Sequence, residues 1–65
     1  MKIENKIREY RETKKITQEE LARSVGVSRQ TIIAMEKGNY EPSLGLVFKL
    51  KKYFEVSVEE LFMIR

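Results

Sequence analysis

The chain has 65 residues, with 13 Lys and Arg against 10 Asp and Glu and with neither cysteine nor histidine. This length allows one domain, residues 1–65, with a thin stability margin, and the missing cysteines exclude disulfides and thiolate zinc sites. Without histidine the commonest general base and metal ligand are absent, so we expect no enzyme, no metal site and no cofactor. The formal charge of +3 allows an anionic partner without requiring one.

The N-terminal sequence MKIENKIREY alternates charged and apolar residues and does not resemble a signal peptide. No stretch approaches the roughly 20 apolar residues of a membrane span. We therefore expect a cytoplasmic protein without membrane attachment. Turn and capping residues divide the chain into five helical segments, and no segment has the pattern of a strand.

The first expected helix covers residues 2–13, where apolar residues recur at helical spacing. The second opens at TQEEL, in which Thr17 can cap the N-terminus while Glu20 reaches back, the pattern of a capping box. It stops at Gly26, a residue that suits the left-handed conformation after a helix.

The third expected helix opens at Ser28, a good N-cap residue, and ends at Gly38. A loop, NYEPS, follows it. The fourth helix then runs from about Ser43 to Phe54. The fifth begins at SVEELF with a second capping box, and it includes Phe62.

The link between the second and third helices is unusually short, because only Val27 separates Gly26 from Ser28. Such a turn makes the helices cross at a large angle, and Ala22 supplies a small residue where they touch. This spacing predicts a helix-turn-helix. The expected fold class is therefore all-α, with five helices and the helix-turn-helix in the second and third.

The segment TQEELARSVGVSRQTIIAMEKGNYEPS resembles the phage repressor and Cro class of helix-turn-helix proteins, the xenobiotic-response-element type. The resemblance extends to Arg11 and to VSVEELF, covers nearly the whole chain, and is greatest to small stand-alone members. It implies a compact repressor-like domain and a sequence-specific DNA-binding transcriptional regulator. Such a regulator acts as a homodimer on a near-palindromic operator.

The resemblance implies that the third helix, residues 28–37, enters the major groove. On its outward face Arg29 suits guanine and Gln30 suits adenine. Ile33 suits the thymine methyl group, and Ala34 is small enough to admit the groove edge. The alternative for Ile33 is packing on a neighbouring loop.

Phosphate contacts form a second expected group. The resemblance implies one of them, because the family uses a Gln at the start of the second helix to bind a phosphate, and residues around the third helix are further candidates. The expected contacts are Gln18, Ser28, Thr31, Lys37, Asn39 and Tyr40. For Ser28 a plain capping role is an equal alternative, and for Tyr40 the alternative is packing on the loop.

The resemblance also implies an ion pair between Arg11 and Glu36 that orients the third helix. The alternative is that both are unpaired surface charges.

A homodimer is expected because two half-sites on one DNA face need recognition helices about 34 Å apart. The expected interface residues are Leu44, Val58, Met63 and Ile64. Phe48 belongs either to this interface or to the core. Gly45 departs from the family pattern, and its role is open between a close approach by another chain and one by the DNA backbone.

An antitoxin or protein-binding adaptor of the same fold, with DNA binding secondary, is the alternative function. The combination of Arg29, Gln30 and Ile33 on one face favours the regulator. The expected partners are double-stranded DNA and a second copy of the chain, with a further protein partner left open.

Overall fold

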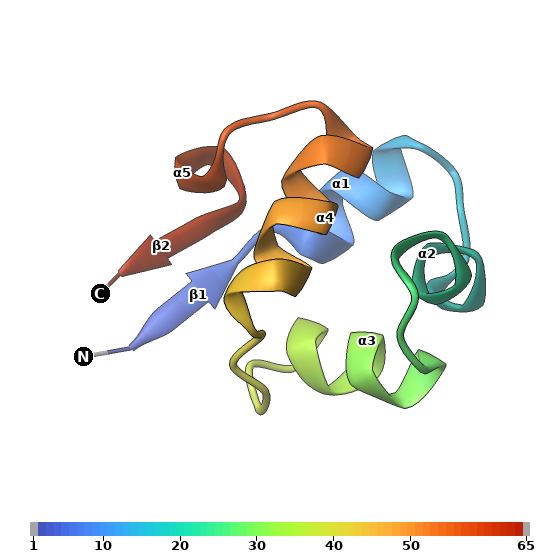
Figure 1. The fold of residues 1–65 in the computed structure, drawn as a ribbon, viewed down its shortest axis with the longest axis horizontal. Helices are drawn as coiled ribbons and strands as arrows, with labels where there is room; N and C mark the ends of the chain where they lie inside the picture. The colour runs from blue at the N-terminus through green and yellow to red at the C-terminus, as the bar shows by residue number, and fades with distance from the viewer. Residues whose placement is uncertain (1, 65) are drawn as a thin grey trace.

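The computed structural model describes residues 2–64 and confirms a compact fold with five helices, to which a two-stranded sheet is added (Figure 1). The elements in chain order are β1 (Ile3–Asn5), α1 (Ile7–Thr13), α2 (Gln18–Val25), α3 (Arg29–Glu36), α4 (Leu44–Phe54), α5 (Val58–Leu61) and β2 (Phe62–Ile64).

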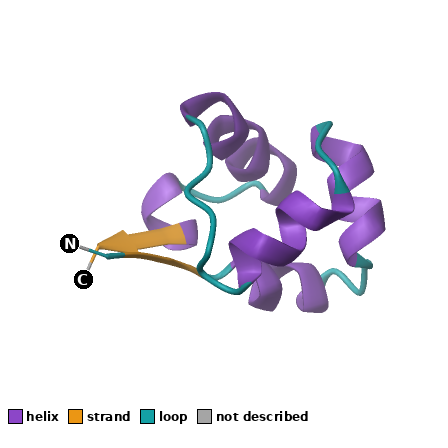
Figure 2. Ribbon diagram, turned by 90° about the horizontal axis from the view of Figure 1, so that it is seen from below, coloured by secondary structure: helices purple, strands orange, loops and turns teal. Residues whose placement is uncertain are grey.

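The strands correct the prediction that no segment is a strand. β1 pairs antiparallel with β2, with Ile3 opposite Ile64 and Asn5 opposite Phe62. The first helix therefore begins at Ile7 rather than at residue 2, and Phe62 belongs to β2 rather than to the fifth helix. Figure 2 shows this terminal hairpin projecting from one end of the helical body, with both chain ends beside each other.

The core takes at least one apolar side chain from every helix. Its buried members are Ile7, Leu21, Ala22, Val25, Ile32, Met35, Leu46, Leu50, Phe54 and Leu61. Within residues 2–64, no buried side-chain nitrogen or oxygen lacks a hydrogen-bond partner. None of the described helices is long and apolar enough to cross a membrane.

Both predicted capping boxes are confirmed. In α2, Glu20 N–H donates to Thr17 Oγ1 at 3.0 Å, and Thr17 N–H donates to the Glu20 carboxylate at 2.7 Å. In α5, Ser57 and Glu60 repeat this exchange at 3.1 and 2.8 Å. The donated backbone hydrogen bonds lower the pKa of both glutamates below its usual range.

Two residues on the exposed side of α4 had open roles. The structure decides the role of Phe48, while the two alternatives for Gly45, a close approach by another chain or by the DNA backbone, stay open. Phe48 is 53% exposed, so the core alternative for it is wrong. A Cβ added at Gly45 would meet no atom within 4 Å, so nothing within residues 2–64 requires a glycine there.

Candidate nucleic-acid interface

The corner between α2 and α3 has the predicted helix-turn-helix geometry. Gly26 ends α2 with a φ of +75°, and Val27 N–H donates to Ala22 C=O at 3.0 Å. Ser28 then caps α3 by accepting from Thr31 N–H at 3.2 Å. Only three residues therefore separate α2 from α3. In Figure 1 α2 is seen nearly end-on and α3 from the side, so the two helices are steeply inclined to each other.

An open groove of about 720 Å³ lies where α1, the N-terminal part of α2 and one side of α3 meet. Five cationic side chains line this basic groove, namely Arg8, Arg11, Arg23, Arg29 and Lys37. Three glutamates, Glu19, Glu20 and Glu36, line it as well, so the formal charge of the lining is net positive. Arg29, Ile33 and Lys37 lie four residues apart along α3, so helical geometry brings them to the same wall. The combination of a basic lining, an apolar side chain and a helix N-terminus suits a polyanion.

The structure brings together only part of the predicted site. Gln18, Arg29, Ile33 and Lys37 line the basic groove. Gln30 and Ser28 are exposed, and Thr31 and Ala34 are half-buried, but none of these four lines it. Asn39 and Tyr40 line a separate recess with residues of the terminal hairpin.

Ile33 is half-buried rather than turned fully to solvent. It lines the basic groove between Arg29 and Lys37, while Ile32 beside it is completely buried in the core. Its accessible part therefore faces the groove together with two cations, where a bound molecule can reach it.

Arg11 and Glu36 form a nearly buried ion pair, so the alternative of unpaired surface charges is wrong. Arg11 Nε donates to Glu36 Oε2 at 2.7 Å and Nη2 donates to Oε1 at 3.2 Å, while Nη1 donates to Ile16 C=O at 2.9 Å. The hydrogen bonds to Glu36 raise the pKa of the Arg11 guanidinium. This arrangement ties the last turn of α3 to α1 and to the loop before α2.

Gln18 joins the same cluster, since its Nε2 donates to Glu36 Oε1 at 3.1 Å. The sequence suggested only a phosphate contact for this residue. Its amide group carries a second hydrogen, so the contact with Glu36 orients the side chain and still leaves a donor for an anion.

Two cationic residues of the groove were missed by the sequence prediction of the site. Arg8 and Arg23 line the basic groove, and each pairs with a glutamate on its own helix, Glu12 at 3.2 Å and Glu19 at 3.1 Å. These pairs are exposed and contribute little to stability, so the guanidinium groups can turn towards an anion at small cost. The sequence shows that both residues are cationic and could bind an anion, but only the fold shows that they line the same groove.

Sequence comparison places the chain among known regulators. A helix-turn-helix family model matches residues 7–61. A helix-turn-helix-type transcriptional regulator of Methanocaldococcus jannaschii is 54% identical over 61 residues, covering 94% of this chain and 92% of that protein. The transcriptional repressor RstR of the cryptic phage CTXphi from Vibrio cholerae is 42% identical over 57 residues, covering 88% of this chain and 51% of the repressor.

Solved structures give the same result. The restriction-modification controller protein C.AhdI from Aeromonas hydrophila superposes with a TM-score of 0.76 at 31% identity, covering 83% of this chain and 82% of that one. The SOS-response repressor LexA from Eubacterium rectale superposes with a TM-score of 0.79 at 35% identity, covering 83% of this chain and 57% of that one. The chain therefore belongs to the repressor-type helix-turn-helix family of DNA-binding transcriptional regulators.

Proposed function

We propose that this regulator binds double-stranded DNA sequence-specifically as a homodimer on a near-palindromic operator, with α3 in the major groove. The observation that carries the proposal is the basic groove, where Arg29 and Ile33 of α3 and its C-cap Lys37 face the N-terminus of α2. In this arrangement α3 can read base edges in the major groove, while the N-terminus of α2 binds the phosphate backbone of the DNA.

The proposed DNA contacts are of two kinds, contacts to base edges and contacts to phosphates. Arg29 donates to guanine, Gln30 pairs with adenine, and Ile33 contacts a thymine methyl group. Ala34 allows close approach of the groove edge. The phosphate contacts are Gln18, Ser28, Thr31, Lys37, Asn39 and Tyr40, to which the structure adds Arg8 and Arg23 as candidates.

The partner copy in this proposal binds an apolar recess of about 360 Å³ beside α4 and the hairpin. This recess is lined by Ile3, Glu41, Pro42, Leu44, Val47, Val58, Glu59, Phe62 and Ile64. Leu44 and Ile64 are each 70% exposed, so the monomer leaves apolar surface in water at this face. Of the expected interface residues Met63 does not line the recess, and neither does Phe48.

Charge and size favour a second copy as the occupant. Lys51 and Lys52 of α4 lie beside Glu59 and Glu60 of α5 at the edge of this face, so a two-fold axis can oppose unlike charges. The longest extent of the Cα trace is 30 Å, close to the spacing of about 34 Å between half-sites. Figure 1 shows the hairpin at one end of this long axis and α3 along one side. A two-fold axis that lies beside the hairpin and points towards the side on which α3 lies leaves both α3 helices on the same side of the dimer.

Selection of bound sequences from a random DNA pool tests the function. We expect a motif with two-fold symmetry and half-sites one helical turn apart. A pool that returns no preferred sequence contradicts the proposal and favours the adaptor alternative.

Two arginines of the basic groove provide matched variants for the assignment of contacts. Arg29→Ala is expected to weaken binding to the selected operator by about 1–3 kcal/mol and to weaken binding to random DNA much less. Arg23→Ala removes a guanidinium from α2 and is expected to weaken binding to both DNAs by a similar factor. If the two variants behave alike on both DNAs, the division into base and phosphate contacts is wrong.

A further inference from the structure

Asn5, the last residue of β1, connects three elements through one half-buried side chain. Its Nδ2 donates to Met35 C=O at 2.9 Å, and its Oδ1 accepts from Ile7 N–H at 3.1 Å. In the hairpin it lies opposite Phe62 of β2. The terminal hairpin, the start of α1 and the end of α3 are therefore linked at this residue.

The carbonyl that Asn5 binds lies in the last turn of α3, where helix carbonyls have no partner within the helix. Met35 C=O also accepts from Gly38 N–H at 3.0 Å, and the Met35 side chain is completely buried. An amide donor is well matched to this end of the helix, which carries the negative end of the helix dipole.

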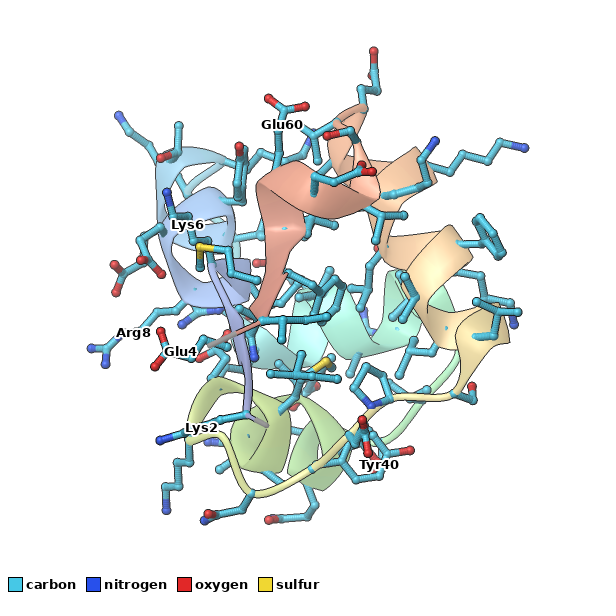
Figure 3. All side chains as sticks on the ribbon, turned by 90° about the vertical axis from the view of Figure 1, so that its left-hand side faces the viewer. Lys2, Glu4, Lys6, Arg8, Tyr40 and Glu60 are labelled. Carbon is cyan, nitrogen blue, oxygen red and sulfur yellow. The ribbon has the colours of Figure 1, made fainter. Side chains whose placement is uncertain are left out.

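The end of α3 is thus held at two successive residues by two different elements. Glu36 is held through its side chain by Arg11 of α1, and Met35 is held through its backbone by Asn5 of β1. Figure 3 shows β1 and β2 side by side, with β1 leading into α1, the labelled Glu4 on β1 and Lys2 just before it. Lys2 and Asn5 line one recess with Gly38, Asn39 and Tyr40 of the segment after α3, so the hairpin lies near that segment as well.

We propose that Asn5 is a positioning residue, which fixes the recognition helix relative to the hairpin and thereby fixes the spacing of the two recognition helices in the dimer. This inference rests on the proposed function, because Ile3, Phe62 and Ile64 of the same hairpin line the recess assigned to the partner copy. The hydrogen bond from Asn5 to Met35 is then the connection between the dimer face and the base-reading face.

Two substitutions separate this role from the cap of α1. Asn5→Ser and Asn5→Asp both keep an oxygen that can accept from Ile7 N–H, and both remove the amide N–H that donates to Met35 C=O. The serine hydroxyl can also donate, but it ends one bond short of the position of Nδ2. Asn5→Asp keeps the shape of the side chain, whereas Asn5→Ser keeps its neutral charge. An effect shared by both variants therefore belongs to the lost donor.

The DNA experiment compares the selected operator with operators that have one base pair inserted or removed between the half-sites. Wild type is expected to bind the altered spacings at least about tenfold more weakly, because each added base pair shifts and rotates one half-site. Both variants are expected to reduce this penalty to about threefold or less. A merely stabilising role for Asn5 lowers all affinities together and leaves the spacing penalty unchanged, and that result overturns the proposal.

Amide hydrogen exchange without DNA tests the connection independently. In both variants we expect exchange at Gly38 and Asn39 to accelerate about tenfold, while Leu50 in the core of α4 keeps its wild-type rate. Unchanged exchange at Gly38 and Asn39, or equal acceleration at Leu50, overturns the proposal. If wild type selects no operator, the proposed function fails, whereas the exchange rates still decide whether Asn5 holds α3.

Discussion

At the scale of single residues, the Arg11–Glu36 pair is a nearly buried ion pair that ties the end of α3 to α1. The two side chains retain only 12% and 6% of their exposure. Glu36→Ala leaves the Arg11 guanidinium without its anion, so we expect the free energy of unfolding to fall by about 3 kcal/mol. Chemical denaturation measures this loss.

The matched control is the exposed pair between Arg8 and Glu12, whose side chains are 67% and 56% exposed. Glu12→Ala is expected to cost under about 1 kcal/mol, because water already screens that pair. Similar losses in the Glu12 and Glu36 variants would show that burial does not distinguish the two pairs.

Ile33 has no hydrogen-bonding group, so it can read DNA only through apolar contact, and the thymine methyl is the apolar group of the major groove. Replacing the contacted thymine by uracil is expected to weaken wild-type binding by roughly 0.5–1 kcal/mol. In Ile33→Ala this loss should disappear, because alanine does not reach the methyl. Binding titrations of both proteins on both operators give the coupling energy.

Ile16 offers a control for that cycle, since it is also half-buried but does not line the basic groove. Ile16→Ala should keep the full difference in affinity between the thymine and uracil operators.

Because Ile33 is half-buried, we expect its replacement by alanine to reduce the free energy of unfolding by about 1 kcal/mol. Absence of coupling at every thymine would leave packing as the role of Ile33.

At the scale of the elements, the two capping boxes make stability depend on acid pH. The backbone hydrogen bonds from Thr17 and Ser57 lower the pKa of Glu20 and Glu60 in the folded state below the usual 4.5. A carboxyl with a lowered pKa stabilises the fold above its ordinary pKa, and this contribution is lost as the pH falls through the folded-state value. We therefore expect the melting temperature to fall over the acid range that begins at the usual pKa of 4.5 and extends below it.

Glu20→Gln combined with Glu60→Gln keeps an acceptor oxygen at both caps but removes both titrations. Thermal melts of this double variant should fall less steeply over that range, so its curve should approach the wild-type curve as the pH decreases. Glu41→Gln, in the loop before α4, takes no part in a capping box and should retain the wild-type slope. Parallel curves for all three proteins would mean that other carboxyl groups dominate the acid transition.

The contrast between caps and strands explains which elements the sequence could predict. Each capping box joins residues three positions apart, so Thr17 with Glu20 and Ser57 with Glu60 were visible as local patterns. The hairpin pairs Ile3 with Ile64 from opposite ends of the chain, and strands of three residues carry too little periodicity to be recognised. Tertiary pairing therefore overrode the helical spacing that assigned Ile3 to the first helix.

The candidate site divides in the same way. Helical geometry alone placed Arg29, Ile33 and Lys37 on one face, and they share the basic groove. The position of Asn39 and Tyr40 beside the hairpin could not be predicted, because the hairpin itself was missed. The bond from Asn5 to Met35 was missed for the same reason.

At the scale of the whole molecule, the proposed homodimer can be tested by placing a charge in the apolar recess. Leu44 is 70% exposed at the start of α4, where an acidic side chain favours the helix dipole. Leu44→Glu should therefore fold normally but place a carboxylate against the partner. We expect wild type to shift from monomer to dimer with increasing concentration in sedimentation equilibrium, and the variant to stay monomeric.

Tyr40→Glu is the control for the added charge, because Tyr40 is exposed but lies outside the apolar recess. This variant should dimerise like wild type in the absence of DNA.

On a two-half-site operator, Leu44→Glu should lose affinity about tenfold or more, because the second half-site no longer binds a linked subunit. Its affinity for a single half-site should stay unchanged, since the basic groove is intact. Wild-type protein that remains a strict monomer both free and on the operator would rule out the dimer, and each half-site would then be read independently.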